Sequence, residues 1–146
     1  MTDEASAAKP QHGGVAFRVA GELYFLPASI AMKVSPIPEM ARVPGGPLAL
    51  RGVALFEGNM IPVVDALDVL DVLEEQPSGE VREPTGAMLV CAVLGESVGL
   101  VGIEVVATGR FETGERAGEV NVGGETARTF DVAAAIAKVR EGRWAV

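Results

Sequence analysis

The segment 95–99, GESVG, has the spacing of the G-x-S-x-G motif, in which a serine acts as the nucleophile of a hydrolase. That motif needs a strand before Ser97 and a helix after it, whereas the following residues, VGLVGIEVV, have the composition of a strand. The single histidine, His12, lies in an N-terminal stretch of small and polar residues. Because a serine hydroxyl without a folded base is a weak nucleophile, we predict that Ser97 is a hairpin-turn residue and that the protein is not an enzyme.

Three aspartates, Asp65, Asp68 and Asp71, follow one another at intervals of three residues, which could indicate a cation site. Hard cations require several oxygens that converge on one point, whereas this spacing on a helix places the carboxylates in a row. We therefore expect a solvated acidic stripe in which Asp65 is the N-cap of the helix. The sequence contains no CxxC, HExxH, P-loop or Rossmann glycine motif, so we predict neither a metal nor a cofactor.

Composition narrows the classes of partner. Apolar residues make up 49% of the 146 residues, enough for the core of one domain or of two small lobes. The net charge of −8 leaves no basic surface for phosphates, so we expect neither nucleic acid nor an anionic membrane surface as a partner. The apolar runs are too short to span a bilayer, and we predict no membrane insertion. The single cysteine, Cys91, is expected to be a small buried side chain in a reducing compartment, and the protein to be cytoplasmic.

The order of elements is mainly that of a β protein. Short runs rich in β-branched and aromatic residues, bounded by glycine-containing turns, predict strands. They lie at 15–20, 22–28, 52–56, 59–64, 87–94 and 98–106, with a further strand before a C-terminal helix. Residues 29–34 fit either a strand or a helical turn, and 110–125 are expected to be a loop with one short strand. Pro62 cannot donate a ladder hydrogen bond and therefore indicates a sheet edge or a barrel rim.

One pattern occurs twice. Gly58 precedes a strand that ends at Asp65, and Gly124 precedes a strand that ends at Asp131 with the same spacing. Each aspartate is followed by apolar residues at helical intervals: Leu67, Leu70 and Leu73 after the first, and Val132, Ile136 and Val139 after the second. The repetition reflects either chance with common turn chemistry or two similar β-lobes, each closed by a strand and a short helix. A polar linker at 74–86 is the expected internal boundary.

In the order and spacing of these elements the chain resembles the CheW-like domain, a chemotaxis coupling module also found in CheA kinases and CheV proteins. The resemblance runs from about Val15 to Val139 and rests on the whole arrangement, because no single motif is specific. In the first half it is carried by FRVAGELYFLPA, VPGGPLALRGV and EGNMIPVVDAL. In the second half it is carried by MLVCAVLGESVGLVGIEVV and ARTFDVAAAIAKV.

The resemblance implies an all-β fold of two SH3-like five-stranded β-barrel lobes that share a hydrophobic core, with short helices after the closing strands. We place this domain at 14–141, between a disordered N-terminal tail at 1–13 and a C-terminal tail at 142–146. Members of the family do no chemistry. They couple the chemoreceptor cytoplasmic tip to the regulatory domain of a CheA-type histidine kinase, and other CheW-like domains are further partners. The implied function is that of a chemotaxis-type signal transduction adaptor.

The resemblance also implies a groove between the lobes that takes the receptor, and barrel faces that take the kinase. Carried over residue by residue, the partner-binding candidates are Ile30, Met32, Val43, Leu50, Glu57 and Asn59. The aliphatic candidates are equally well explained as core residues, because single apolar residues of a barrel are usually buried.

The chain departs from the family pattern at three places. Glu57 stands where the family commonly has arginine, Ile103 where it has aspartate, and the connection 107–119 is shorter than usual. A reversed charge at an interface rim selects against partners that present carboxylates. We therefore expect Glu57 to be exposed and free to contact Lys or Arg of a partner. Two alternatives stay open: a divergent scaffold of a specialised chemosensory-like pathway with non-standard partners, or a small-ligand-binding sensor domain.

Overall fold

The computed structural model describes residues 10–44, 49–73 and 86–139. Within these ranges the elements are β1 (Gln11–Val19), β2 (Glu22–Pro27), β3 (Ala31–Pro36), β4 (Leu50–Phe56), β5 (Asn59–Asp65), α2 (Ala66–Leu73), β6 (Ala87–Val93), β7 (Glu96–Thr113), β8 (Glu119–Val122), β9 (Glu125–Thr129) and α3 (Val132–Val139). None of the helices in these ranges has the length and apolar character needed to cross a membrane. Strands dominate, and the all-β class expected from the sequence is confirmed.

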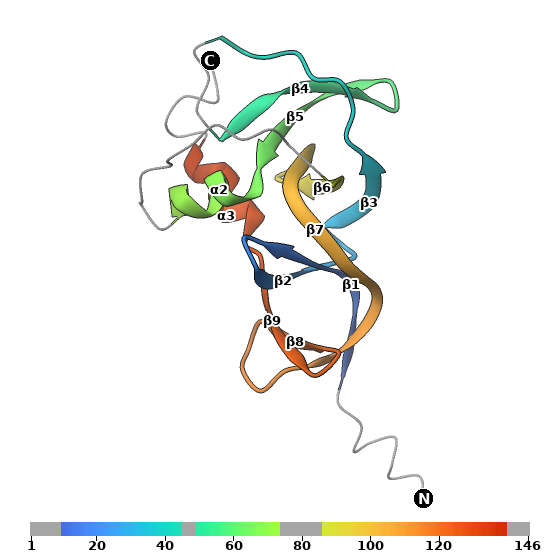
Figure 1. The fold of residues 1–146 in the computed structure, drawn as a ribbon. Coiled ribbons are helices and arrows are strands. Elements are labelled where there is room, and N and C mark those ends of the chain that lie inside the picture. Colours follow the sequence, from blue (N-terminus) through green and yellow to red (C-terminus); the bar gives the residue numbers. More distant parts are fainter. Residues whose placement is uncertain (1–9, 45–48, 74–85, 140–146) are drawn as a thin grey trace, which may run out of the picture.

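The strands form two five-stranded lobes that share β7, the strand that runs through both (Figure 1). In lobe A, β1 pairs with β2, β2 with β9, β9 with β8 and β8 with the C-terminal part of β7, which returns to β1 and closes the ring. In lobe B, β4 pairs with β5, β5 with the N-terminal part of β7, β7 with β6 and β6 with β3. The pairing is consistent with the two SH3-like barrels that the resemblance implied.

Four hairpins close on two-residue turns in which both residues have positive φ. These turns are Ala20–Gly21, Glu57–Gly58, Leu94–Gly95 and Gly123–Gly124. Positive φ at both positions matches the twist of the flanking strands, and glycine adopts it without steric cost. The three non-glycine residues each carry a penalty of about 1–2 kcal/mol in this conformation. The turns predicted at Gly21 and at Gly58 are confirmed.

Among the described residues, three apolar clusters form the core. The largest lies between the lobes and includes Phe17, Leu89, Leu100 and Phe130 from the strands and their ends, with Val69 and Ile136 from the helices. A smaller cluster in lobe A contains Phe25 and Val120, and one in lobe B contains Ile61 and Val90. Full burial of each such side chain contributes about 1.5–3 kcal/mol, so the large cluster makes the two lobes depend on each other. The predicted shared hydrophobic core is confirmed.

Both helices in the described ranges begin directly after an aspartate. Asp65 Oδ1 accepts hydrogen bonds from the backbone N–H groups of Leu67 (3.0 Å) and Asp68 (3.3 Å), and Asp131 Oδ1 accepts one from Ala134 (3.1 Å). These contacts satisfy N–H groups that a helix start would leave unpaired, and both predicted N-caps are confirmed. The two helices pack against each other beside the cluster between the lobes (Figure 1). The repeated strand–aspartate–helix pattern therefore reflects two lobes of one design.

Several boundaries differ from those expected. β1 begins at Gln11, so residues 11–13, which we expected in a disordered tail, pair with β7. β7 continues to Thr113, into the region expected to be mainly loop, because it pairs there with β1 and β8 of lobe A. Such long-range pairing leaves no local pattern in the sequence. Residues 74–85 of the predicted linker and the predicted tail at 142–146 lie outside the described residues.

Candidate partner-binding site

A pocket opens in lobe B and takes its lining from all five strands of that lobe. It is lined by Met32 and Lys33 of β3, Phe56 of β4, Glu57 of the following turn, Asn59 and Ile61 of β5, Val90 of β6 and Ser97 of β7. Its volume is about 220 Å³. Ile61 and Val90 are buried, whereas Met32 is exposed. The pocket thus has an apolar floor and an apolar wall that reaches the solvent.

Lys33 and Glu57 form an ion pair at the pocket. Lys33 Nζ lies 2.9 Å from Glu57 Oε2 and 5.5 Å from the centre of the Phe56 ring. The side chains are 55% and 60% exposed, so the pair contributes only about 0–1 kcal/mol to stability. The predicted exposure of Glu57 is confirmed. Lys33 of the same chain pairs with this carboxylate, so a partner that contacts Glu57 would meet both charges, and that contact stays a prediction.

The six predicted site residues do not form one group. Met32, Glu57 and Asn59 come together as lining of the pocket. Ile30 and Leu50 are half-buried and pack against the cluster between the lobes, as expected of core residues. Val43 is exposed in the connection between β3 and β4, and it does not line the pocket. A role of any of these residues in partner binding stays a prediction.

Exposed apolar side chains are concentrated on lobe B. They are Met32 and Val34 of β3, Val43 of the β3–β4 connection, Leu55 of β4, Met60 of β5 and Leu94 of the β6–β7 turn. In the described ranges, Val106 on the lobe A part of β7 is the only other large one. Leu55 and Met60 stand opposite each other on the β4–β5 hairpin. In the described ranges, lobe B thus exposes most of the large apolar side chains, and Leu55 and Met60 form a neighbouring pair among them.

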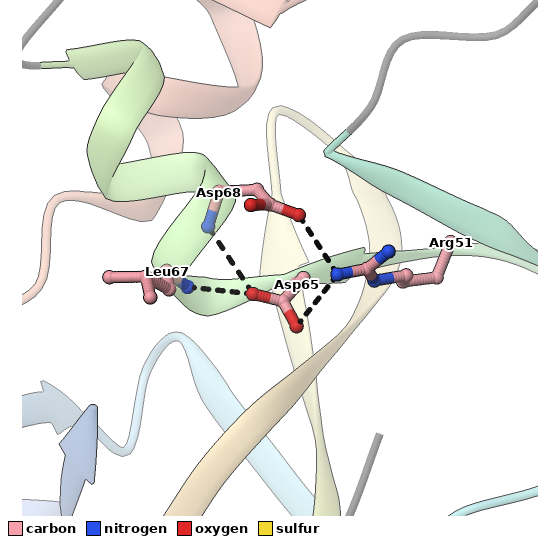
Figure 2. Close-up of polar contacts among 4 residues, drawn as sticks. All are labelled: Arg51, Asp65, Leu67 and Asp68. Atoms are coloured by element: carbon pink, nitrogen blue, oxygen red, sulfur yellow. Dashed lines mark hydrogen bonds and ion pairs between the residues drawn. The ribbon is translucent and has the colours of Figure 1, made fainter. Parts of the chain in front are cut away.

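A buried ion cluster joins β4 to the start of α2, as Figure 2 shows. Arg51 Nη2 lies 3.0 Å from Asp68 Oδ2 and 3.4 Å from Asp65 Oδ2, while the other oxygen of Asp65 caps the helix. Arg51 is 9% exposed and both aspartates are more deeply buried. Loss of one partner from such a cluster leaves a buried charge uncompensated. The cluster therefore fixes β4, whose far end carries Phe56 and the pocket.

The predicted solvated acidic stripe is wrong at Asp68, which is fully buried against Arg51. The most deeply buried residues of α2 also include Ala66 and Val69, whereas Leu67 and Leu70, taken as its apolar face, are only half-buried. The helix sequence ALDVLDVL is apolar at every position except the two aspartates, so its pattern does not define which side faces the core. The side chain of Asp71 lies outside the described residues.

Sequence reasoning missed Arg51, Lys33 and the Leu55–Met60 pair. A signal for Arg51 was present, because an arginine within the apolar run LALRGVALF needs a buried acidic partner. No comparable signal exists for Leu55 and Met60. Strand alternation places both on one face of the hairpin but does not show whether another segment covers that face.

The residues considered for hydrolase chemistry are separated by the fold. Ser97 belongs to β7, which continues as a strand, so the strand–serine–helix geometry of a nucleophile elbow is not formed. The turn residues are Leu94 and Gly95, slightly earlier than predicted. His12 lies in lobe A, where its Nε2 is 3.0 Å from Thr113 Oγ1.

Cys91 is fully buried in the cluster between the lobes, as expected. Burial raises the pKa of the Cys91 thiol to about 12. Because the thiolate is the reactive form, this cysteine is an inert core residue. In the part of the chain that the structure describes, no three metal-ligating side chains are grouped.

Comparison with known proteins agrees with the geometry. A family model described as the CheW-like domain matches residues 13–143. Among solved structures, the scaffolding protein TtCheW from Thermoanaerobacter tengcongensis is similar, with a TM-score of 0.61 and 19% identity over 86% of this chain and 92% of that chain. At this identity the likeness bears on the fold alone. A search of curated proteins found no match. Because the family model spans nearly the whole sequence, the chain belongs to the CheW-like domain family.

Proposed function

We propose that this protein is a non-catalytic adaptor of chemotaxis-type signal transduction, which couples chemoreceptors to a CheA-type histidine kinase in the cytoplasm. The observation that carries the proposal is the family match over residues 13–143. An adaptor needs binding surfaces and no reacting group. The pocket agrees with this requirement, because its one hydroxyl side chain, Ser97, lies on a continuous strand.

Lobe B is the surface on which we expect the partners to bind. Protein interfaces depend on a few apolar anchors at the centre with polar groups around them. Met32, Leu55 and Met60 supply exposed apolar area, and Lys33 and Glu57 supply charge beside it.

The turn residue Leu94 adds support for this assignment. It is 55% exposed and has a φ of 52°. Both properties are unfavourable for leucine in an isolated molecule, because the side chain stays in water and the backbone is strained. A partner that covers Leu94 would offset the first of these costs.

The ion pair of Lys33 and Glu57 makes the partners specific to this chain. An arginine at position 57, as in the family pattern, would place two cations side by side at the pocket. A partner that docks here meets both charges together, and charged groups at an interface select partners more than they add affinity. This arrangement supports a divergent scaffold that serves its own receptor and kinase in a specialised pathway.

The pocket is too small to favour the alternative of a small-ligand sensor. Sites that enclose drug-sized ligands have volumes of about 300–1,000 Å³, whereas this pocket has about 220 Å³. That space suits one apolar side chain of a protein partner better than a metabolite.

Reconstitution with purified components tests the proposal. The full chain would be titrated against the regulatory domain of the CheA-type kinase and against a chemoreceptor cytoplasmic fragment, both from the same organism. We expect binding to each, and we expect kinase autophosphorylation to respond to the receptor only when the chain is present. The proposal fails if the chain binds neither fragment at low or at moderate salt.

A further inference from the structure

The rings of the two lobes differ at one pair of equivalent positions, Leu55 of β4 and Asn121 of β8. Each residue stands three positions before the second residue of its hairpin turn, which is Gly58 in lobe B and Gly124 in lobe A. Asn121 pairs on its outer side with Glu112 of β7, and this pairing closes the ring of lobe A. No strand in the described ranges pairs with Leu55 on the corresponding side. Beyond the Ala41–Val53 bridge, the edge of β4 away from β5 is therefore unpaired in the described ranges, and we call this unpaired edge with the adjoining pocket the opening.

The backbone of Leu55 points into this opening. Val53 exchanges both of its backbone hydrogen bonds with Ala41, at 2.9 Å each, so its N–H and C=O point away from β5. Backbone groups alternate between the two edges of a strand, and Leu55 lies two residues further along. Its N–H and C=O therefore face the same side, where the described part of the chain offers them no backbone partner.

Apolar side chains border the opening on both faces of β4, and on the pocket side they lie beside the Lys33–Glu57 ion pair. On the inner face, Phe56 borders the pocket, and Met32 of β3 borders it from the other side of the opening. On the outer face, Leu55 and Met60 are exposed. Side chains of a strand alternate between its faces. An added strand would thus direct one side chain into the pocket and its neighbours beside Leu55 and Met60.

We propose that the opening between β3 and β4 binds an extended segment of a partner protein, which adds as a strand to the edge of β4. The backbone of the segment pairs with the N–H and C=O of Leu55, and one aliphatic or aromatic side chain of the segment occupies the pocket. In strand addition, main-chain hydrogen bonds give affinity and side-chain pockets give selectivity. This inference rests on the proposed adaptor function and specifies how the partner is held.

The variant Leu55→Pro removes the N–H that the inference requires, with Leu55→Val as the matched control. Proline is tolerated on a strand edge whose N–H faces solvent, and thermal unfolding would verify that both variants fold. Each variant would be titrated against the kinase regulatory domain and the receptor fragment. We expect Leu55→Pro to weaken binding of at least one fragment by about tenfold or more, and Leu55→Val to change it by less than about threefold.

Hydrogen exchange of the Leu55 amide in the wild-type chain provides a second measurement that does not depend on a variant. We expect rapid exchange in the free chain and slow exchange in the complex. Binding by wild type with an unprotected Leu55 amide, or equal binding by Leu55→Pro, would overturn strand addition and leave the adaptor function intact. A dimer of the free chain that Leu55→Pro abolishes without affecting fragment binding would make a second copy the occupant, which also overturns the inference. If wild type binds neither fragment, the adaptor function itself fails and the inference falls with it.

Discussion

Lobe A and lobe B follow the same order of elements, but their rings are completed in different ways. In lobe A, β8 pairs with β7, and both carboxylate oxygens of Glu125 accept hydrogen bonds from Arg18, at 2.8 and 3.1 Å. In lobe B, β4 is joined to the β3 side by the bridge between Ala41 and Val53, and a pocket remains. Nearly all exposed large apolar side chains in the described ranges belong to lobe B. Lobe A thus closes its ring by strand pairing, whereas lobe B leaves part of its β4 edge unpaired and exposes apolar side chains, the surface on which we propose that partners bind.

The starts of the two described helices also differ between the lobes, in the burial of their polar residues. The third residue of α2 is Asp68, which is buried against Arg51, whereas the third residue of α3 is Ala134, which is exposed. Of the two capping residues, Asp65 is 2% exposed and Asp131 is exposed. A carboxylate in lobe B therefore supports the stability of the fold more than its counterpart in lobe A.

The largest expected effect follows from this contrast. Asp68→Ala leaves Arg51 buried with one of its two acidic partners, and we expect it to lower the free energy of unfolding by about 3–5 kcal/mol. Asp131→Ala removes an exposed cap and should cost about 0.5–2 kcal/mol. Urea unfolding followed by circular dichroism measures both.

A double variant separates charge burial from lost packing in this cluster. Arg51→Met combined with Asp68→Leu removes one charge of each sign and leaves Asp65, whose Oδ1 still accepts two backbone hydrogen bonds as the helix cap; Arg51 Nε has no hydrogen-bond partner in the described structure to lose. We expect the double variant to be less destabilised than Asp68→Ala, because apolar replacements of a buried pair are often neutral. Equal costs for Asp68→Ala and Asp131→Ala would contradict the contrast between the lobes.

Two of the three strained turn residues, Leu94 and Ala20, give the next effect. Their φ angles are 52° and 51°, in lobe B and lobe A respectively. Asparagine tolerates this conformation, so Leu94→Asn and Ala20→Asn should each stabilise the fold by about 0.5–1 kcal/mol in thermal unfolding. Only Leu94→Asn should weaken binding to the kinase or receptor fragment. Unchanged binding by Leu94→Asn would remove this turn from the proposed interface.

Exchange of the charges of Lys33 and Glu57 distinguishes a contact within the chain from a contact with a partner. Glu57→Arg places two cations together and should cost less than about 1 kcal/mol of stability. The swapped variant, Lys33→Glu with Glu57→Arg, should recover that stability but not the affinity for the native partner, with the difference reduced at high salt. Full recovery of affinity in the swapped variant would show that binding of the partner does not depend on which position carries which charge.

The smallest effect belongs to the Arg18–Glu125 pair of lobe A. The pKa of Glu125 is lowered, chiefly by the hydrogen bond from Arg18. A lowered carboxylate pKa stabilises the fold above the ordinary value of 4.5, and this contribution is lost as the pH falls through the folded-state pKa. The melting temperatures of wild type and Arg18→Gln should therefore differ slightly at neutral pH and converge in acid. Arg110→Gln is the control for loss of charge, and a difference that persists in acid would contradict the assignment.

Local features of the sequence were sufficient for much of the fold. The hairpins at Gly21 and Gly58 were predictable because two-residue turns require a positive φ that glycine supplies. The helix starts were predictable because Asp65 and Asp131 precede helical patterns, and a cap acts within three residues.

Contacts between distant segments could not be predicted in this way. The pair of Lys33 with Glu57, the burial of Asp68 against Arg51 and the passage of β7 into lobe A each depend on how strands far apart in sequence are paired. The candidate site was therefore predicted only in part. Its lining comes from five strands, and neither local spacing nor periodicity in the sequence shows which strands lie next to each other.

If partners bind lobe B, matched charge insertions in the two lobes should have different effects on binding. Met60 of lobe B and Val106 on the lobe A part of β7 are 60% and 45% exposed, so glutamate at either position should leave the fold intact. Met60→Glu and Val106→Glu would each be titrated against the kinase regulatory domain and the receptor fragment. We expect Met60→Glu to weaken binding of at least one fragment by about tenfold or more, as for an apolar anchor, and Val106→Glu to leave both affinities unchanged. Wild-type binding by Met60→Glu, or an equal or larger loss in Val106→Glu, would contradict binding of partners to lobe B.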